Sequence, residues 1–125
     1  MVSKRIGLAA ALLALSSVSV LAAPAMTAES STGPILVDQH GMTLYTFDKD
    51  TPGMTNCYDK CAENWPPLMA AGGAMAEGDW TLVERTGGGM MWAYKGMPLY
   101  LWVKDEKSGD TTGDGVNDVW HVAKP

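Results

Sequence analysis

The chain has 125 residues, a formal net charge of −5 at pH 7 and two cysteines. Its length suits one domain with a modest core. The acidic balance argues against nucleic acid and anionic membrane surfaces as partners, because both need clustered positive charge. Cations and basic partners fit this charge, and solubility alone also explains it.

The first 25 residues have the pattern of a cleavable secretory signal. Lys4 and Arg5 give a positive start, residues 6–15 are apolar, and Ala23 and Ala25 supply small residues before a cut after Ala25. An uncleaved anchor is the alternative, but serines interrupt the apolar run before it reaches the roughly 20 residues of a spanning helix. We expect a periplasmic or secreted protein with no stable membrane anchor after cleavage. Loss of the two basic residues takes the net charge from −5 to −7.

An internal repeat organises the rest of the chain. Residues 26–33 are small and polar and predict a flexible leader. Residues 41–50 (GMTLYTFDKD) reappear as 96–105 (GMPLYLWVKD), and the same offset maps Trp65 onto Trp120. We therefore predict two copies of one supersecondary unit. Their expected bounds, within a single duplicated domain over 34–125, are about 33–70 and 88–125.

Each unit predicts a hairpin. In the second unit, Lys95-Gly96 lies between the β-rich runs 90–94 and 97–103, which is typical of a two-residue hairpin turn. In the first unit, residues 38–41 lead from an apolar run into 42–48 in the same way. Strand alternation places Tyr45 and Phe47 on one face of that strand.

The remaining segments predict a further strand, a loop and one short helical turn. The strand covers 80–85 and the loop 69–79. The helical turn falls within 57–64, with Thr55 or Asn56 as its cap. The expected fold is mainly β: a small antiparallel β domain made of two internally repeated hairpin units with pseudo-twofold symmetry.

Cys57 and Cys61 predict a disulfide. An even cysteine count in an exported chain favours pairing, and a spacing of four suits a bridge across one turn. A redox-active pair and a metal site are the alternatives, although the spacing matches neither a thioredoxin-like nor a zinc motif. The second unit lacks the cysteines, so we expect Asp/Gly turn chemistry to hold its corresponding loop.

That second loop has a partial calcium pattern. Asp110, Thr112, Asp114 and Asp118 fall at positions 1, 3, 5 and 9 of a calcium-loop template, whereas position 12 holds His121 instead of the required Glu. Plain turns are the alternative, because Asp and Gly form tight turns without an ion.

Methionine and histidine supply a second possible metal set. Thioether sulfur suits Cu(I), and imidazole also binds copper. The candidate copper ligands are His40, Met42, Met90, Met91, Met97 and His121. Packing is the alternative, because Met also fills irregular cores.

Most aromatic residues are expected in the core, with a carbohydrate or haem surface as the alternative. These residues are Tyr45, Phe47, Trp65, Trp92, Tyr94, Tyr100, Trp102 and Trp120. No nucleophile with a neighbouring base and no phosphate-binding glycine motif is evident, so we expect no enzyme.

Several of these segments together resemble the bacterial secreted-repeat family, described as a predicted lipoprotein with a Tyr-x-aromatic-x-x-Asp motif. They are 44–50, Cys57 and Cys61 before 65–68, 96–100, and 109–122. The motif occurs in both units, at Tyr45–Asp50 and Tyr100–Asp105. The resemblance implies an exported protein built from this repeat, and the family's function is generally unknown. This chain has no cysteine directly after the expected cleavage site, where a lipid would be attached.

The leading functional hypothesis is a non-enzymatic binding or structural module of the envelope. Its partner would be an unknown envelope protein or a small ligand, with no cofactor predicted. One alternative is a periplasmic metal-binding protein that holds copper through Met and His or calcium through the Asp loop. The other is a small thiol–disulfide redox partner.

Overall fold

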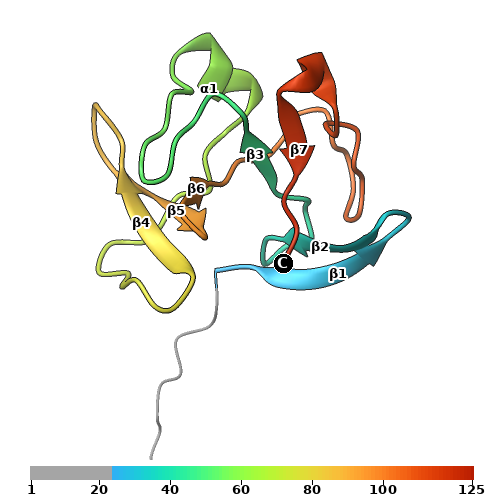
Figure 1. Cartoon of the computed structure of the whole chain (residues 1–125), viewed down its shortest axis with the longest axis horizontal. Coiled ribbons are helices and arrows are strands. Elements are labelled where there is room, and N and C mark those ends of the chain that lie inside the picture. Colours follow the sequence, from blue (N-terminus) through green and yellow to red (C-terminus); the bar gives the residue numbers. More distant parts are fainter. Residues whose placement is uncertain (1–23) are drawn as a thin grey trace, which may run out of the picture.

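The computed structural model describes residues 24–125 (Figure 1). The predicted signal peptide lies outside the described residues, apart from Pro24 and Ala25. Over the described range, no helix has the length and apolar character to cross a bilayer.

The fold is mainly β, as predicted, with short antiparallel strands and little helix. The strands are β1 (Met26–Ser30), β2 (Gly33–Val37), β3 (Tyr45–Phe47), β4 (Trp80–Glu84), β5 (Met90–Tyr94), β6 (Met97–Pro98) and β7 (Trp120–Val122). The helical segments are α1 (Lys60–Asn64) and the 3-10 turn η1 (Val116–Asp118). The hydrogen-bonded sheets are β1–β2, β3–β7 and β4–β5–β6.

The flexible leader predicted over 26–33 is wrong. Residues Met26–Ser30 form β1, which pairs antiparallel with β2 from Met26 opposite Val37 to Ser30 opposite Gly33. The prediction rested on the small polar side chains. Such side chains are compatible with β1 because it is an edge strand whose side chains are largely exposed. Backbone pairing holds it in place, and Ala28 alone packs on the main core.

The predicted hairpin of the second unit is confirmed. β5 and β6 pair with Tyr94 opposite Met97. Lys95 and Gly96 between them have φ of 52° and 89°, as a two-residue hairpin turn of the primed type requires. β4 falls where a strand was predicted.

The short helix forms, but its expected cap is wrong. α1 begins at Lys60 after Asp59, and no side chain caps it. Thr55 is buried and Asn56 is exposed, and both bond to other partners instead. The Thr55 hydroxyl bonds to that of Tyr100, and the Asn56 N–H donates to the Asp50 carboxylate. Tertiary contacts therefore outweigh the local capping preference.

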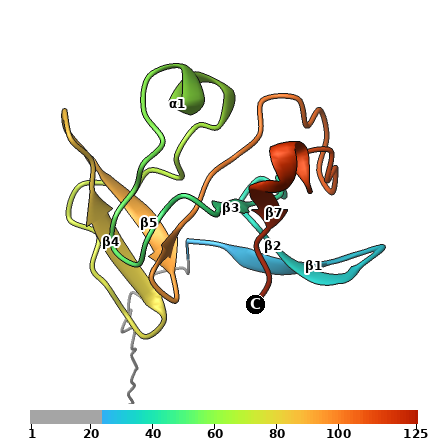
Figure 2. The same cartoon turned by 45° about the horizontal axis from the view of Figure 1, so that its top comes forward.

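The two repeats exchange their last strands. We call residues 26–69 repeat one and 81–124 repeat two. β7 belongs to repeat two but pairs with β3 of repeat one, with Tyr45 opposite Val122 (Figures 1 and 2). In the matching place, Leu101 N donates to Pro66 O at 2.8 Å, which joins the end of repeat one to repeat two. Neither repeat therefore completes its own sheet.

Four aromatic rings form a continuous stack between the repeats. Ring centroids are 4.2 Å apart for Phe47 and Trp120, 3.8 Å for Trp120 and Trp65, and 3.9 Å for Trp65 and Trp102. Trp65 and Trp120 occupy equivalent positions, as do Phe47 and Trp102. The stack thus follows the pseudo-twofold symmetry, and the predicted inward face of Phe47 is confirmed.

Candidate functional site

The repeated Tyr-x-aromatic-x-x-Asp motif forms cross-links inside the fold. Tyr45 Oη donates to Asp105 Oδ2 at 2.7 Å, and Tyr100 Oη donates to Asp50 Oδ2 at 2.6 Å. Each tyrosine therefore binds the aspartate that belongs to the motif of the other repeat. This pairing gives the motif a structural role.

These groups are buried and fully engaged. Burial raises the pKa of both tyrosines above the ordinary range, and the bonded aspartates raise it further. Burial also raises the pKa of Asp50, against the opposing hydrogen bonds from Tyr100 and the Asn56 N–H. Nearby, the buried Arg85 donates from Nη2 to Cys57 O at 2.8 Å. Because these polar atoms bond to one another, they leave little capacity for a substrate.

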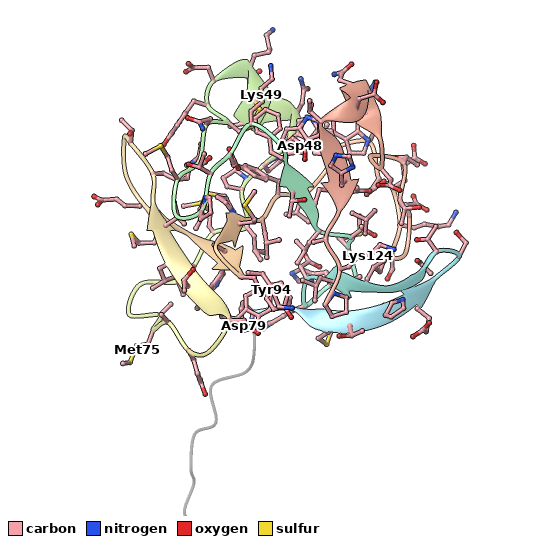
Figure 3. The ribbon with its side chains drawn as sticks, viewed as in Figure 1. Asp48, Lys49, Met75, Asp79, Tyr94 and Lys124 are labelled. Carbon is pink, nitrogen blue, oxygen red and sulfur yellow. A yellow bond between two sulfur atoms is a disulfide. The ribbon has the colours of Figure 1, made fainter. Side chains whose placement is uncertain are left out.

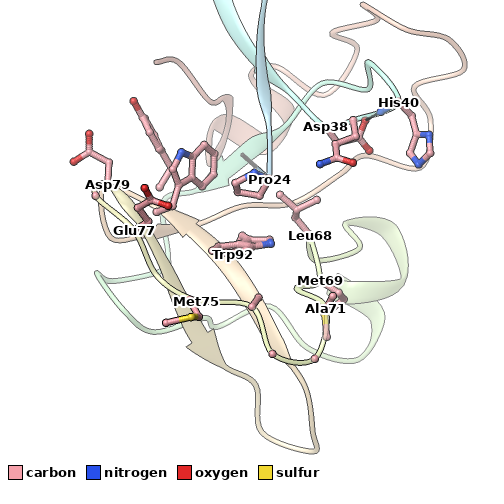
Figure 4. Close-up of a pocket in the computed structure, with 17 residues that line it drawn as sticks. Pro24, Asp38, His40, Leu68, Met69, Ala71, Met75, Glu77, Asp79 and Trp92 are labelled. Atoms are coloured by element: carbon pink, nitrogen blue, oxygen red, sulfur yellow. Dashed lines mark hydrogen bonds between the residues drawn. The ribbon is translucent and has the colours of Figure 1, made fainter. Parts of the chain in front are cut away.

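A groove of about 950 Å³ lies on another part of the surface (Figure 4). Its apolar and aromatic lining residues include Pro24, Leu68, Met69, Met75, Trp80, Trp92 and Tyr94. Its polar ones include Asp38, Gln39, His40, Glu77 and Asp79. Small residues of the predicted loop 69–79, which is confirmed as irregular, complete one side.

β4 and β5 position the three aromatic side chains of the groove. Trp80 and Tyr94 are opposite each other in the pairing, and their ring centroids lie 4.8 Å apart. Trp92 is on the same face of β5 as Tyr94, because side chains alternate along a strand. Its ring lies 6.3 Å from that of Trp80 at 87°, so the two indoles form a corner.

Carboxylates surround this corner. Glu77 and Asp79 are exposed and come just before β4, and the Asp79 carbonyl accepts a bond from Lys95 N at 2.8 Å. Asp38 is buried on the other side, where its Oδ1 accepts bonds from the N–H groups of His40 and Met42. Among the described residues that line the groove, none is Lys or Arg.

Repeat one shows that the fold does not require these aromatic residues. Leu36 N donates to Ala123 O at 2.9 Å, and Trp92 N donates to Leu68 O at 2.8 Å. Since Ala123 and Leu68 are equivalent, Leu36 is the counterpart of Trp92. The paired registers likewise make Ala25 the counterpart of Trp80, and Asp38 the counterpart of Tyr94. The same backbone thus forms with Leu, Ala and Asp in place of three aromatic rings.

The predicted calcium residues take part in turns. Asp110 Oδ2 accepts bonds from the Glu106 and Lys107 N–H groups, which lower its pKa. The Thr112 hydroxyl donates to the Asp105 carboxylate, and Asp114 Oδ1 accepts from Val122 N. Asp118 is exposed. Within residues 24–125, no group of three or more His, Cys, Asp or Glu is arranged to hold a metal. The calcium hypothesis stays a prediction.

The predicted copper residues lie on several elements. Met91 is fully buried and its sulfur accepts a bond from Arg85, whereas Met90 faces the opposite side of β5. His121 on β7 has its Nε2 2.8 Å from Asp48 Oδ2, and His40 lines the groove. Met97 is on β6, and Met42 follows the turn that contains His40. Copper binding also stays a prediction.

The Cys57–Cys61 disulfide is present. Cys57 is fully buried and Cys61 is partly exposed. The bridge lies beside α1 in repeat one, whereas hydrogen bonds to Asp105 from Thr112 hold the corresponding loop of repeat two. This is the division of roles that the sequence predicts.

Sequence reasoning missed the groove. It assigned Trp92 and Tyr94 to the core, and Tyr94 does pack against a buried cluster, but it did not single out Trp80, Glu77 or Asp79. A usable signal was present, because the segments aligned with β4 and β5 in the first unit contain no aromatic residue. A difference between two copies of one structural unit points to a role beyond folding.

Fold and groove together define a class: a small, disulfide-bonded β domain built from two interlocked repeats, with a ligand-sized groove lined by residues of both repeats and of the segment between them. The chain belongs to the Lipoprotein_15 family, described as a secreted repeat of unknown function, whose model matches residues 26–69 and 81–124. Both matches include the first strand of the repeat, in agreement with the correction at β1. No curated protein and no solved structure matches the chain.

Proposed function

We propose that this protein is a periplasmic, non-enzymatic binding module whose ligand site is the groove at Trp80, Trp92 and Tyr94. The observation that carries the proposal is the difference between the repeats. Trp92 and Tyr94 of repeat two, with Trp80 just before it, place three aromatic rings where the equivalent positions of the first unit hold Leu36, Asp38 and Ala25. Aromatic rings that remain partly exposed in a concave site are typical of ligand recognition.

The dimensions and chemistry of the groove support this role. Ligand pockets usually measure about 300–1,000 Å³ and combine apolar walls with a few polar groups. Here the walls are indole and phenol rings, and the polar groups are carboxylates and His40. The Glu77–Trp80 turn holds one rim, with Trp80 N donating to Glu77 O at 3.0 Å. The site is therefore largely preformed.

Family and covalent structure support an exported location. The family is a secreted repeat, and a disulfide is typical of an oxidising compartment. We place the protein in the periplasm, where a small binding module meets solutes that pass the envelope. A mass spectrum of the protein purified from that compartment tests both the location and the cut after Ala25.

The binding role is tested by NMR titration with a fixed panel: choline, glucose, N-acetylglucosamine and 3,3-dimethyl-1-butanol. We expect at least one probe to shift the indole N–H signals of Trp80 and Trp92. Trp92→Leu, which installs the residue of repeat one, should remove the response. Val103→Ala is the matched control, because Val103 is an exposed apolar residue outside the groove. A panel without any response would overturn the proposal.

A further inference from the structure

We infer that the groove takes an organic cation with a methylated ammonium head group, which rests on the proposed binding function. Three observations lead to this ligand class: the perpendicular indoles, the surrounding carboxylates, and the composition of the lining. Each limits the chemistry in a different way.

The indole corner selects for a cation of modest size. An ammonium group is attracted to the face of an aromatic ring within about 6 Å of its centroid, and Trp is the best partner. With centroids 6.3 Å apart at 87°, Trp80 and Trp92 can both contact one head group placed in the corner. Tyr94 is already engaged on one face, where Lys95 Nζ lies 5.3 Å from its centroid. The two indoles are therefore the primary contact.

Most of the charge around the corner is negative. Glu77 and Asp79 are exposed at the rim, while Asp38 is held by backbone N–H groups on the other side. No Lys or Arg is among the described lining residues, and the Lys95 ammonium over the Tyr94 ring offsets only part of the charge of these three carboxylates. The full chain is also acidic, at −5. An anionic ligand is repelled, and a cationic ligand is attracted over several ångströms.

The apolar lining distinguishes an organic cation from a metal ion. Leu68 and Met75 line the same groove as Trp92 and offer hydrocarbon and thioether surface there (Figure 4). A small hydrated ion loses its water shell in such surroundings at a large cost in free energy. A methylated ammonium is weakly hydrated and gains from burial of its methyl groups. The groove therefore suits a positive charge surrounded by methyl groups.

The test compares choline with 3,3-dimethyl-1-butanol, which has the same shape without the charge. We expect choline to bind the full chain on the order of tenfold more tightly, as measured by calorimetry or by NMR titration. Trp92→Leu and Trp80→Ala should each abolish the difference, and both substitutions install the residue of repeat one. Two such variants keep the test valid if one fails to fold.

Charge variants distinguish the effect of the rim carboxylates on choline binding from the effect of the overall acidic surface. Glu77→Gln and Asp79→Asn should each weaken choline binding severalfold, with less effect at high salt. Asp48→Asn is the matched control, because Asp48 is exposed and lies far from Asp79 and Tyr94 (Figure 3). Equal weakening by Asp48→Asn would contradict a local role for the rim.

The outcomes separate this inference from the proposed function. Equal affinity for choline and for 3,3-dimethyl-1-butanol overturns the cation inference. The proposed binding function then stands, with recognition by shape and not by charge. Binding of a sugar without binding of choline overturns it as well. If no probe of the panel shifts the indole N–H signals of Trp80 and Trp92, the proposed binding function itself is overturned.

Discussion

Tyr45 and Tyr100 exchange both of their backbone hydrogen bonds, with Tyr45 N 2.8 Å from Tyr100 O and Tyr100 N 3.0 Å from Tyr45 O. The two residues occupy the same position in the two repeats, so their pair lies on the pseudo-twofold axis. Their hydroxyl groups then reach across that axis to Asp105 and Asp50. The Tyr-x-aromatic-x-x-Asp motif therefore supplies the contacts that join the two repeats, which we call the joint.

Removal of one hydroxyl should weaken this joint. Tyr45→Phe leaves Oδ2 of the buried Asp105 without its donor and removes an acceptor from Gly113 N, so we expect a loss of about 1–3 kcal/mol in the free energy of unfolding. Urea denaturation measures it. Asp105→Asn and the double variant complete a mutant cycle, in which we expect a coupling energy above about 0.5 kcal/mol. Strictly additive losses would show that the bond contributes nothing.

Strand exchange makes the two repeats interdependent. A chain split after Gly73, in the exposed loop before β4, should give two fragments that are unfolded alone and fold when mixed. Each fragment lacks the strand that completes its sheet, and the aromatic stack needs both. Near-ultraviolet circular dichroism, which reports the stacked indoles, follows the recovery. A fragment with native signal on its own would contradict the interlocked arrangement.

The disulfide should stabilise repeat one modestly. Replacement of Cys57 and Cys61 by Ser opens a loop of sequence separation 4, for which chain entropy predicts a loss of about 2 kcal/mol or less. We expect a lower melting temperature and unchanged choline binding, because neither cysteine lines the groove. A melting temperature equal to that of the wild type would show that the bridge has no structural role.

Asp50 and Asp110 should give opposite pH dependence. Burial raises the pKa of Asp50 above its ordinary value of 3.8. Its contribution to stability is therefore fully present below that value and is lost as the pH rises through the folded pKa. Hydrogen bonds lower the pKa of Asp110, so its contribution is present above 3.8 and is lost as the pH falls through the folded pKa.

Urea denaturation between about pH 2 and pH 6 compares the wild type with Asp50→Asn and Asp110→Asn, over the range in which carboxylates titrate. As the pH rises, the stability of the wild type should fall relative to Asp50→Asn and rise relative to Asp110→Asn. Slopes of the same sign would contradict the assigned environments.

The sequence predicted the strands whose pattern reflects burial. Lys95-Gly96 has the chemistry of a tight turn, so the second hairpin was evident. The first hairpin forms over a shorter stretch than predicted: Val37 is bridged to Thr43, whereas β3 pairs with β7. β1 was missed because an edge strand needs no apolar side chains. The exchange of strands was missed because a repeat offset relates Trp65 to Trp120 without stating which strand either one pairs with.

The predicted disulfide is present, but the groove was not predicted, for a related physical reason. Motif reasoning favours residues that carry familiar chemistry, such as Cys57 or Asp114, and both are used to hold loops. The groove depends on the relative orientation of Trp80 and Trp92, which arises from strand register and from the loop before β4. Only the contrast with Ala25 and Leu36 in the first unit could have indicated it.

We propose that Trp92 serves a ligand and not the fold, whereas Trp80 and Tyr94 also pack against a buried cluster that includes Leu36 and Leu99. The most direct measurement is the melting temperature of Trp92→Leu together with its choline affinity. We predict that stability changes by less than about 1 kcal/mol while binding is lost, because Leu36 fills the same position in repeat one. A loss of about 3 kcal/mol or more, as expected when a core Trp is truncated, would show that Trp92 is a structural residue and would contradict the claim.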